Sequence, residues 1–364
     1  MLAPVGLTVG GVHFGLPELA AGAMAVALTG YVLTGGADFG GGVWDLFAAG
    51  PRRQAQRALV AEAIGPIWEA NHVWLILVVV LCFTCFPPAF AALSTVLHVP
   101  LTLMLVGVVL RGSAFVFRAY DARRDETHER VQRRWGLLFS VSSLVTPVLF
   151  GVCLGALASG AVGRAAAATA GTFADRFVRP WATPFACAVG AMTLALFALL
   201  AAAYLTVEAD AAGDAALADD FGRRGVWAQA ATAASAAAAL ALAPASMPVR
   251  DVITGGAWAA VLQTVTLAAA VGLVLALRGR HWRLARFAAQ GEASCLLWGW
   301  AWAQFPELVP PGGTAARLAA PPLTIALALG TLAVGTLILL PSFVYLFRVF
   351  KGPARGAAAG GGGA

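Results

Sequence analysis

Charged side chains are scarce in this chain of 364 residues. Only 12% of the residues are Asp, Glu, Lys or Arg, whereas soluble domains carry about 25%. Hydrophobic residues account for 60% of the chain, and its mean hydropathy is +0.81. Because so few charges cannot cover a globular surface in water, the composition excludes a soluble protein and indicates a polytopic membrane protein.

Lysine is almost absent, since Lys351 is the single lysine among 24 basic residues. We interpret this as a compositional bias, so an arginine is not taken as functional from its residue type alone. A net charge of +6 can accompany nucleic-acid binding, but the basic residues of a membrane protein mainly set its orientation. We therefore expect no nucleic-acid partner.

The motifs of soluble catalytic domains are missing. The chain has no phosphate-binding loop, no glycine-rich dinucleotide motif between a strand and a helix, and no nucleophile elbow. Cys82 and Cys85 form a C-x-x-C pattern inside an apolar run without a second pair, so we expect packed thiols and no metal site. No positively charged region precedes the first apolar stretch, so no cleavable signal peptide is expected.

Apolar runs near the ~20 residues that cross a bilayer recur along the whole chain. Helices satisfy their own backbone hydrogen bonds in lipid, so the runs predict an all-α integral membrane protein. The nine predicted spans lie near 16–34, 64–86, 89–110, 135–157, 184–205, 226–244, 257–277, 287–305 and 324–347. They form one polytopic membrane domain over 1–352, followed by a disordered cytoplasmic tail over 353–364.

Basic residues divide unequally between the connections of these spans. Eighteen lie on one side and five on the other, and Arg111 ends the third span. The positive-inside rule then predicts a cytoplasmic C-terminus and an N-terminus on the outer side of the membrane.

Glycines crowd the first polar segment, Tyr31–Asp45, where five of the eight residues of Gly35–Gly42 are glycine. Glycine costs about 1 kcal/mol per residue in a helix interior, so we expect a broken or sharply turned backbone, close packing, or both. Asp38 lies within this segment. Two interpretations stay open: a helix cap near the interface, or a carboxylate at the membrane edge that passes protons or binds a cation.

The second polar segment, IGPIWEANHVWL over Ile64–Leu75, opens the second span. Pro66 suits the first turn of a helix. Glu69 and His72 are three residues apart, so they share a helix face and can hydrogen-bond. This pair predicts either a proton relay or an interfacial capping cluster within a belt of tryptophans.

The third span contains His98 and Met104, which are residue types that ligate haem, although an isolated histidine in a membrane more often hydrogen-bonds a neighbouring carbonyl. Arg111 either pairs with Asp38 or Glu69 across helices or extends to the membrane surface.

Three segments resemble signatures of subunit II of cytochrome bd-type ubiquinol oxidases. Gly30–Tyr31 with Thr34–Gly40 resembles the first-helix signature of that family, and Ile64–Leu75 resembles its more distinctive second-helix signature. Pro100–Arg118 resembles the third. The three motifs occur in the family's order and spacing, and beyond them the similarity is mainly topological.

The resemblance implies two four-helix bundles plus one peripheral helix, in the inner membrane of a bacterium. It implies a subunit of a quinol:O2 oxidoreductase, paired with a homologous subunit I that binds haem b and a chlorin-type haem d. The function expected for this chain is to support subunit I and to contribute proton and oxygen access. The resemblance leaves open a small single-span subunit, and a structural quinone that some members hold.

Site residues follow from the motif positions. Asp38, Glu69, His72 and Arg111 would lie on or near a proton pathway, and Trp74 would lie near an oxygen path. The remaining motif positions are expected to be structural: Gly36, Gly40, Pro66, Trp68, Asn71 and Arg118.

The chain departs from the family pattern at several positions. Gly35 and Val116 stand where the family usually has acids, and Glu69 stands where Asp is common. His72 replaces a more usual Gln or Glu. These differences indicate a divergent member, in which we expect His72 to compensate partly for the missing acids.

Two other functions stay open. A proton-coupled secondary transporter would use Asp38, Glu69 and His72, and would contain a broken helix at 35–42. A scaffold subunit without redox relevance would explain the acids missing at Gly35 and Val116.

Overall fold

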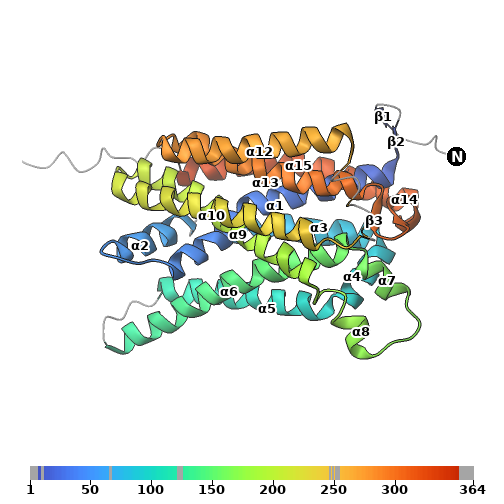
Figure 1. Ribbon diagram of the computed structural model, residues 1–364, viewed down its shortest axis with the longest axis horizontal. Coiled ribbons are helices and arrows are strands. Elements are labelled where there is room, and N and C mark those ends of the chain that lie inside the picture. The colour runs from blue at the N-terminus through green and yellow to red at the C-terminus, as the bar shows by residue number, and fades with distance from the viewer. Residues whose placement is uncertain are drawn as a thin grey trace, which may run out of the picture.

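The computed structural model describes residues 7–9, 12–64, 68–120, 126–245, 247, 250 and 255–351. Long helices dominate, and they run side by side along the longest axis of the molecule (Figure 1). A helix lies at each predicted span: α1 (Leu16–Leu46), α3 (Trp68–Cys85), α5 (His98–Tyr120), α6 (Glu126–Ala158), α9 (Pro184–Ala211), α10 (Ala215–Leu242), α12 (Gly256–Arg278), α13 (Trp282–Gln304) and α15 (Pro322–Lys351).

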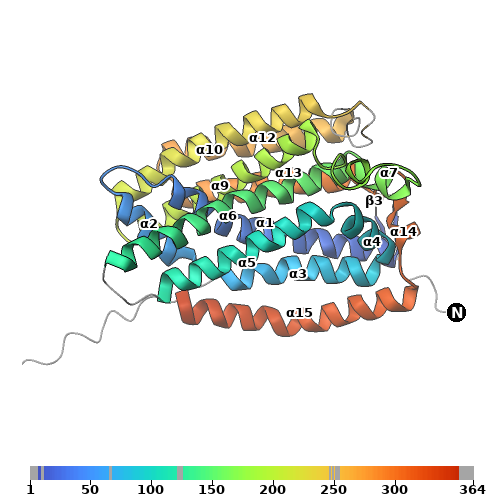
Figure 2. The ribbon, with the colours of Figure 1, turned by 90° about the horizontal axis from the view of Figure 1, so that it is seen from below.

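Shorter elements connect these helices at the two ends of the molecule. Helix α2 (Arg53–Ile64) lies at one end (Figures 1 and 2). The opposite end carries α4 (Pro87–Val96), α7 (Ala161–Ala167), α8 (Phe173–Phe177), α14 (Ala315–Leu318) and two antiparallel hairpins, β1 (Leu7–Val9) with β2 (Val12–Phe14) and β3 (Glu307–Val309) with β4 (Gly313–Thr314).

Seven helices of the described residues are long and apolar enough to cross a membrane. Helices α3 and α4 together count as an eighth if the pair, bent by 119°, is one span. Helix α13 is in neither group, and it carries Arg283, Arg286 and Glu292. A count of nine spans therefore stays a prediction.

Several helix boundaries differ from the predicted spans, and α6 and α10 begin at Glu126 and Ala215, before the predicted 135 and 226. Helix α1 continues to Leu46 instead of ending near residue 34. The third span was predicted to begin at 89, but the chain bends by 119° between α3 and α4, at Phe86, and α5 begins at His98. Pro87 and Pro88 favour this bend, because proline fits the first turn of a new helix and cannot continue the previous one.

The helices pack as two groups of four. In one group α1 contacts α3 and α6, and α6 contacts α5. In the other, α9 contacts α10 and α13, and α12 contacts α10 and α13. Helix α9 joins the groups through α1 and α6, and α15 lies outside them against α1 and α3 (Figure 2). This arrangement agrees with the predicted two bundles plus one peripheral helix.

Helix α1 passes without a break through the glycine-rich segment, so the predicted break is wrong and the predicted close packing is confirmed. A Cβ on Gly40 would lie 1.9 Å from the Phe197 carbonyl oxygen of α9, and a Cβ on Gly36 would lie 2.9 Å from Phe197 Cδ1. The glycines let two helix backbones approach closely, as small residues do between membrane helices. A proton-coupled transporter was favoured by a broken helix at 35–42, and α1 has no break there.

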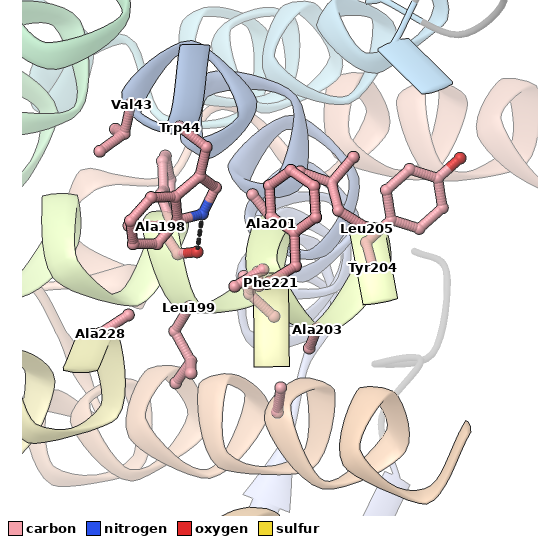
Figure 3. Close-up of a cluster of buried hydrophobic side chains, with 14 of the residues drawn as sticks. Val43, Trp44, Ala198, Leu199, Ala201, Ala203, Tyr204, Leu205, Phe221 and Ala228 are labelled. Atoms are coloured by element: carbon pink, nitrogen blue, oxygen red, sulfur yellow. Dashed lines mark hydrogen bonds between the residues drawn. The ribbon is translucent and has the colours of Figure 1, made fainter. Parts of the chain in front are cut away.

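The tightest part of the core lies between α1 and α9. Trp44 Nε1 donates a 2.8 Å hydrogen bond to the Ala198 carbonyl oxygen (Figure 3). Around it, Leu199 and Phe221 are fully buried, and so is Ala201. Small alanines on α9 leave room for the large rings of its neighbours, so α1 is fixed against the second bundle.

Candidate functional site: a buried ion pair in the first bundle

Asp38 of α1 and Arg111 of α5 form an ion pair inside the first bundle. Arg111 Nη2 lies 2.5 Å from Asp38 Oδ1, and the side chains are 1% and 0% exposed for Arg111 and Asp38, respectively. The same nitrogen donates to the Asp38 carbonyl oxygen at 3.1 Å, and Arg111 Nε donates to Ser143 Oγ of α6 at 3.0 Å. Of the alternatives for Arg111, pairing with Asp38 is confirmed, and extension to the surface is wrong.

Aromatic rings enclose the guanidinium on its faces. The Arg111 Cζ atom lies 4.6 Å from the centroid of the Phe39 ring and 5.0 Å from that of Phe139. Both distances suit cation–π contact. The charge is therefore held by one carboxylate, one hydroxyl and two ring faces, away from solvent.

Asp38 retains one oxygen for further chemistry. Its Oδ2 is buried and has no hydrogen-bond partner among the described residues. Asp38 lies inside α1, eight residues before its end, so the helix cap expected from the sequence is wrong. The position of Asp38 at the membrane edge stays a prediction. One carboxylate oxygen of Asp38 is thus held by the cation, and the other is left without a partner.

His72 of α3 lies beside this pair. Its ring centroid is 6.2 Å from that of Phe39 and 6.4 Å from that of Tyr31. Tyr31 is buried, and a Cβ on Gly35 would lie only 3.0 Å from its ring. Tyr31 therefore covers the position where the family usually has an acid.

Trp74 packs on the backbone of α1, since a Cβ on Gly30 would lie 2.8 Å from its indole ring. Asn71, one turn before it, is buried, and its Nδ2 has no hydrogen-bond partner among the described residues. Trp74 thus helps to seat α3 against α1.

Several predicted residues lie partly or wholly outside the described part of the chain. Pro66 lies outside it entirely. Trp68 and Glu69 begin α3, and Arg118 lies in α5, but their side chains are outside the described residues. The predicted contact of Glu69 with His72 therefore stays a prediction.

Side chains whose types ligate metals include His98, Cys82 and Cys85. His98 Nδ1 lies 2.9 Å from the Thr95 carbonyl oxygen, in the local hydrogen bond expected from the sequence. Cys82 and Cys85 are free and buried, as predicted. No group of three or more His, Cys, Asp or Glu side chains that could hold a metal occurs in the described ranges. Two pockets of the described residues, lined by Ala49–Arg52 with α10 and by Val207 with α13, have no His, Met or Cys in their linings.

Asp45 and Glu292 are among the buried acids that sequence reasoning missed. Asp45 is 1% exposed, accepts a 3.2 Å hydrogen bond from Ser140 Oγ, and lies 3.8 Å from Arg57 Nε. It is seven residues after Asp38, so the two acids share a helix face, and this spacing could have identified it. Glu292 of α13 accepts a 2.9 Å hydrogen bond from Gln229 of α10.

Comparisons with known proteins agree with this geometry. The sequence profile described as "Cytochrome bd terminal oxidase subunit II" matches residues 16–350. Cytochrome bd-I ubiquinol oxidase subunit 2 of Escherichia coli (strain K12) is 31% identical over 137 residues, 38% of this chain and 34% of the relative. Cytochrome bd ubiquinol oxidase subunit 2 of Bacillus subtilis (strain 168) is 30% identical over 129 residues, 35% of this chain and 36% of the relative. These alignments span about a third of the curated relatives.

A solved structure, the bd oxidase from Geobacillus thermodenitrificans, matches with a TM-score of 0.74 at 23% sequence identity. The match covers 92% of this chain and 98% of the matched chain, and it concerns the fold. Because the profile covers nearly the whole chain, including every residue of the Asp38–Arg111 site, the chain belongs to the cytochrome bd terminal oxidase subunit II family.

Proposed function

We propose that this chain is subunit II of a quinol:O2 oxidoreductase in the bacterial inner membrane. Quinol oxidation supplies the electrons that reduce O2 to water, and the protons for water come from the cytoplasm, so charge separates without a pump. The observation that carries the proposal is the buried Asp38–Arg111 pair, which joins two of the three family-like motifs.

In this proposal the first bundle conducts protons. Asp38 Oδ2 accepts a proton, and Arg111 holds the carboxylate in place through Oδ1. His72, whose ring lies beside that of Phe39, exchanges protons with Asp38. Glu69 continues the route along α3. The Tyr31 ring fills the space that a side chain at position 35 would occupy. This supports a proton route that runs through His72 and not through an acid at position 35.

Haem b and a chlorin-type haem d belong to a partner subunit I in this proposal, as the family resemblance implies. We derive no step of this chain through those groups. The chain supports subunit I, and Trp74, packed on Gly30, lies beside a path for oxygen.

A difference spectrum tests the proposal. The tagged chain, purified gently from its native membrane, should carry the haem b and red-absorbing chlorin bands of its partner in the reduced-minus-oxidised spectrum. A sample that keeps its partners but shows no haem bands would reject the oxidase assignment.

Replacing His72 tests the proton route. We expect His72→Ala to slow quinol-dependent oxygen consumption by about ten-fold or more, because a positioned proton-transfer group contributes on the order of a hundred-fold. The matched control is His98→Ala, which removes a ring that bonds the local Thr95 carbonyl and packs on Phe173 and Phe177, and it should leave turnover unchanged. Equal turnover in both variants, at equal haem content, would exclude His72 from the route.

A further inference from the structure

A pocket of about 380 Å³ opens at the end of the bundle that carries α2. Two segments far apart in sequence line it: the connection from α1 into α2, and the first turns of α10. The side chains that matter are Arg52 and Gln56 from the first segment and Asp220, Arg223, Arg224 and Trp227 from the second. None of them belongs to the Asp38–Arg111 site.

The lining carries a surplus of positive charge. Its single carboxylate, Asp220, accepts two 2.7 Å hydrogen bonds from Arg52, one of 3.1 Å from Gln56 Nε2 and one of 2.5 Å from Arg223. One negative charge thus faces three guanidinium groups. The Arg223 side chain is 67% exposed, so it can turn to a ligand while Arg52 holds Asp220.

Of the three arginines that line the pocket, Arg52 and Arg223 pair with Asp220, and Arg224 does not. Its Nη2 donates to Gln56 Oε1 at 2.7 Å and to the Phe47 carbonyl oxygen at 3.2 Å. Its Nη1 has no hydrogen-bond partner, and within the described part of the chain Arg224 forms no ion pair. The rings of Trp44 and Phe221 lie at 5.7 and 5.2 Å from its Cζ and orient it.

The position of the pocket suits a lipid headgroup. Trp227, on its rim, is 76% exposed, and Phe47 nearby is 59% exposed. Exposed tryptophan beside clustered arginine is typical of the headgroup level of a bilayer. The pocket lies at the end of the bundle where the Arg-rich connections emerge, which is the predicted cytoplasmic face.

We propose that this pocket binds a phosphate group, supplied by the headgroup of an anionic phospholipid. Guanidinium groups match phosphate oxygens in geometry and charge. Arg223 and Arg224 bind the phosphate, Arg52 keeps Asp220 turned away from it, and Trp227 contacts the lipid below the headgroup. A free phosphate offers the same chemistry, so the test distinguishes the two sources.

The test measures thermal unfolding of the complex that contains this chain, purified from membranes and stripped of loosely bound lipid. Phosphatidylglycerol, phosphatidylcholine or inorganic phosphate is titrated in at constant ionic strength. A ligand of the folded state raises Tm with concentration. We expect phosphatidylglycerol to raise Tm and phosphatidylcholine not to.

Two variants of equal charge change decide whether the pocket is responsible. Arg223→Gln should weaken the phosphatidylglycerol response about five-fold, since one basic residue near a membrane surface contributes about that factor. Arg280→Gln is the control, because Arg280 is 68% exposed at the same end and pairs with Asp219 but does not line the pocket. It should respond like the unaltered protein.

Asp220→Asn tests whether positive charge in the pocket drives binding. It makes the lining more positive, so phosphatidylglycerol should raise Tm more than in the unaltered protein. Equal weakening by Arg223→Gln and Arg280→Gln, or an equal response to phosphatidylcholine, would overturn the proposal. A response to inorganic phosphate alone that Arg223→Gln abolishes would support the phosphate site and overturn the lipid as its source.

Discussion

The Arg111 guanidinium is held by groups of three kinds: the Asp38 carboxylate, the Ser143 hydroxyl, and the ring faces of Phe39 and Phe139. Removing two charges from water costs several kcal/mol per ion, and their attraction in the interior offsets this only with good geometry and further hydrogen bonds. The pair is therefore weak evidence for stability by itself. Each partner, however, depends strongly on the other.

Breaking the pair tests this dependence. We expect Arg111→Met to lower the free energy of unfolding by about 3–5 kcal/mol, because it leaves a buried carboxylate without its cation. The double variant Asp38→Leu with Arg111→Met should lose less than Arg111→Met alone, since it buries no unpaired charge. Unfolding of the purified complex in detergent measures both losses. Asp38→Leu alone completes the comparison. If the double variant loses as much free energy of unfolding as the two single variants together, the coupling is contradicted.

At the scale of elements, α1 shows how glycine serves a membrane helix. Gly40 faces the backbone of α9, whereas a Cβ on Gly22 would meet no atom within 4 Å outside its own turn. The same residue type thus has opposite roles along one helix. Close packing between α1 and α9 stabilises the segment that its composition alone disfavours as a helix.

Alanine at these two glycines separates the roles. Gly40→Ala should lower Tm, because its Cβ would lie 1.9 Å from the Phe197 carbonyl oxygen and overpacking costs about 1–3 kcal/mol. Gly22→Ala meets no neighbour and should leave Tm unchanged or raise it, since alanine favours a helix by about 1 kcal/mol. Equal shifts in thermal unfolding would show that packing on α9 does not decide the effect.

Helices α10 and α13 share the buried pair of Gln229 and Glu292. Gln229 Nε2 donates to Glu292 Oε1, while Gln229 Oε1 and Glu292 Oε2 have no hydrogen-bond partner among the described residues. A proton on the carboxyl would supply the donor that these two acceptors lack. The polar contact thus joins two helices of the second bundle.

We expect Gln229→Leu to lower the free energy of unfolding by about 1–3 kcal/mol, because it leaves both carboxyl oxygens of Glu292 buried and unbonded. Glu292→Gln keeps an acceptor for Gln229 and adds a donor, so its loss should be under about 1 kcal/mol. Denaturation of the two variants side by side measures the difference. The reverse order would show that the charge of Glu292, and not its hydrogen bond, stabilises the contact.

At the scale of the whole molecule, hydrogen bonds and ion pairs link three helix connections at one end of the bundle: α1 to α2, α9 to α10, and α12 to α13. Arg224 of α10 donates to the Phe47 carbonyl oxygen at the end of α1, and Arg52 pairs with Asp220. Arg280, between α12 and α13, pairs with Asp219. These connections were predicted to share one side of the membrane, and the contacts place them at the same end of the bundle. Which side faces the cytoplasm stays a prediction.

Reporter fusions test the orientation. Green fluorescent protein fused after the last residue should fluoresce, because the predicted C-terminus is cytoplasmic. Alkaline phosphatase at the same position should be inactive, since it matures only outside the cytoplasm. Immunoblots control for equal expression. An active phosphatase fusion with a dark fluorescent fusion would reverse the assignment.

The sequence by itself determined that the chain lies in a membrane, where its apolar helices lie, and which family it resembles, because hydrophobic runs and short motifs are local properties of a chain. It left two alternatives for Arg111, pairing with a buried acid or extension to the membrane surface. Spacing along one helix identifies neighbours on that helix but not which helices touch. Only the tertiary structure selected Asp38 as the partner of Arg111 and placed Asp45 and Glu292 in the interior. A run of glycines permits either a bend in the helix or close contact with a neighbour. In α1 the helix stays straight enough to pack its glycines against the backbone of α9.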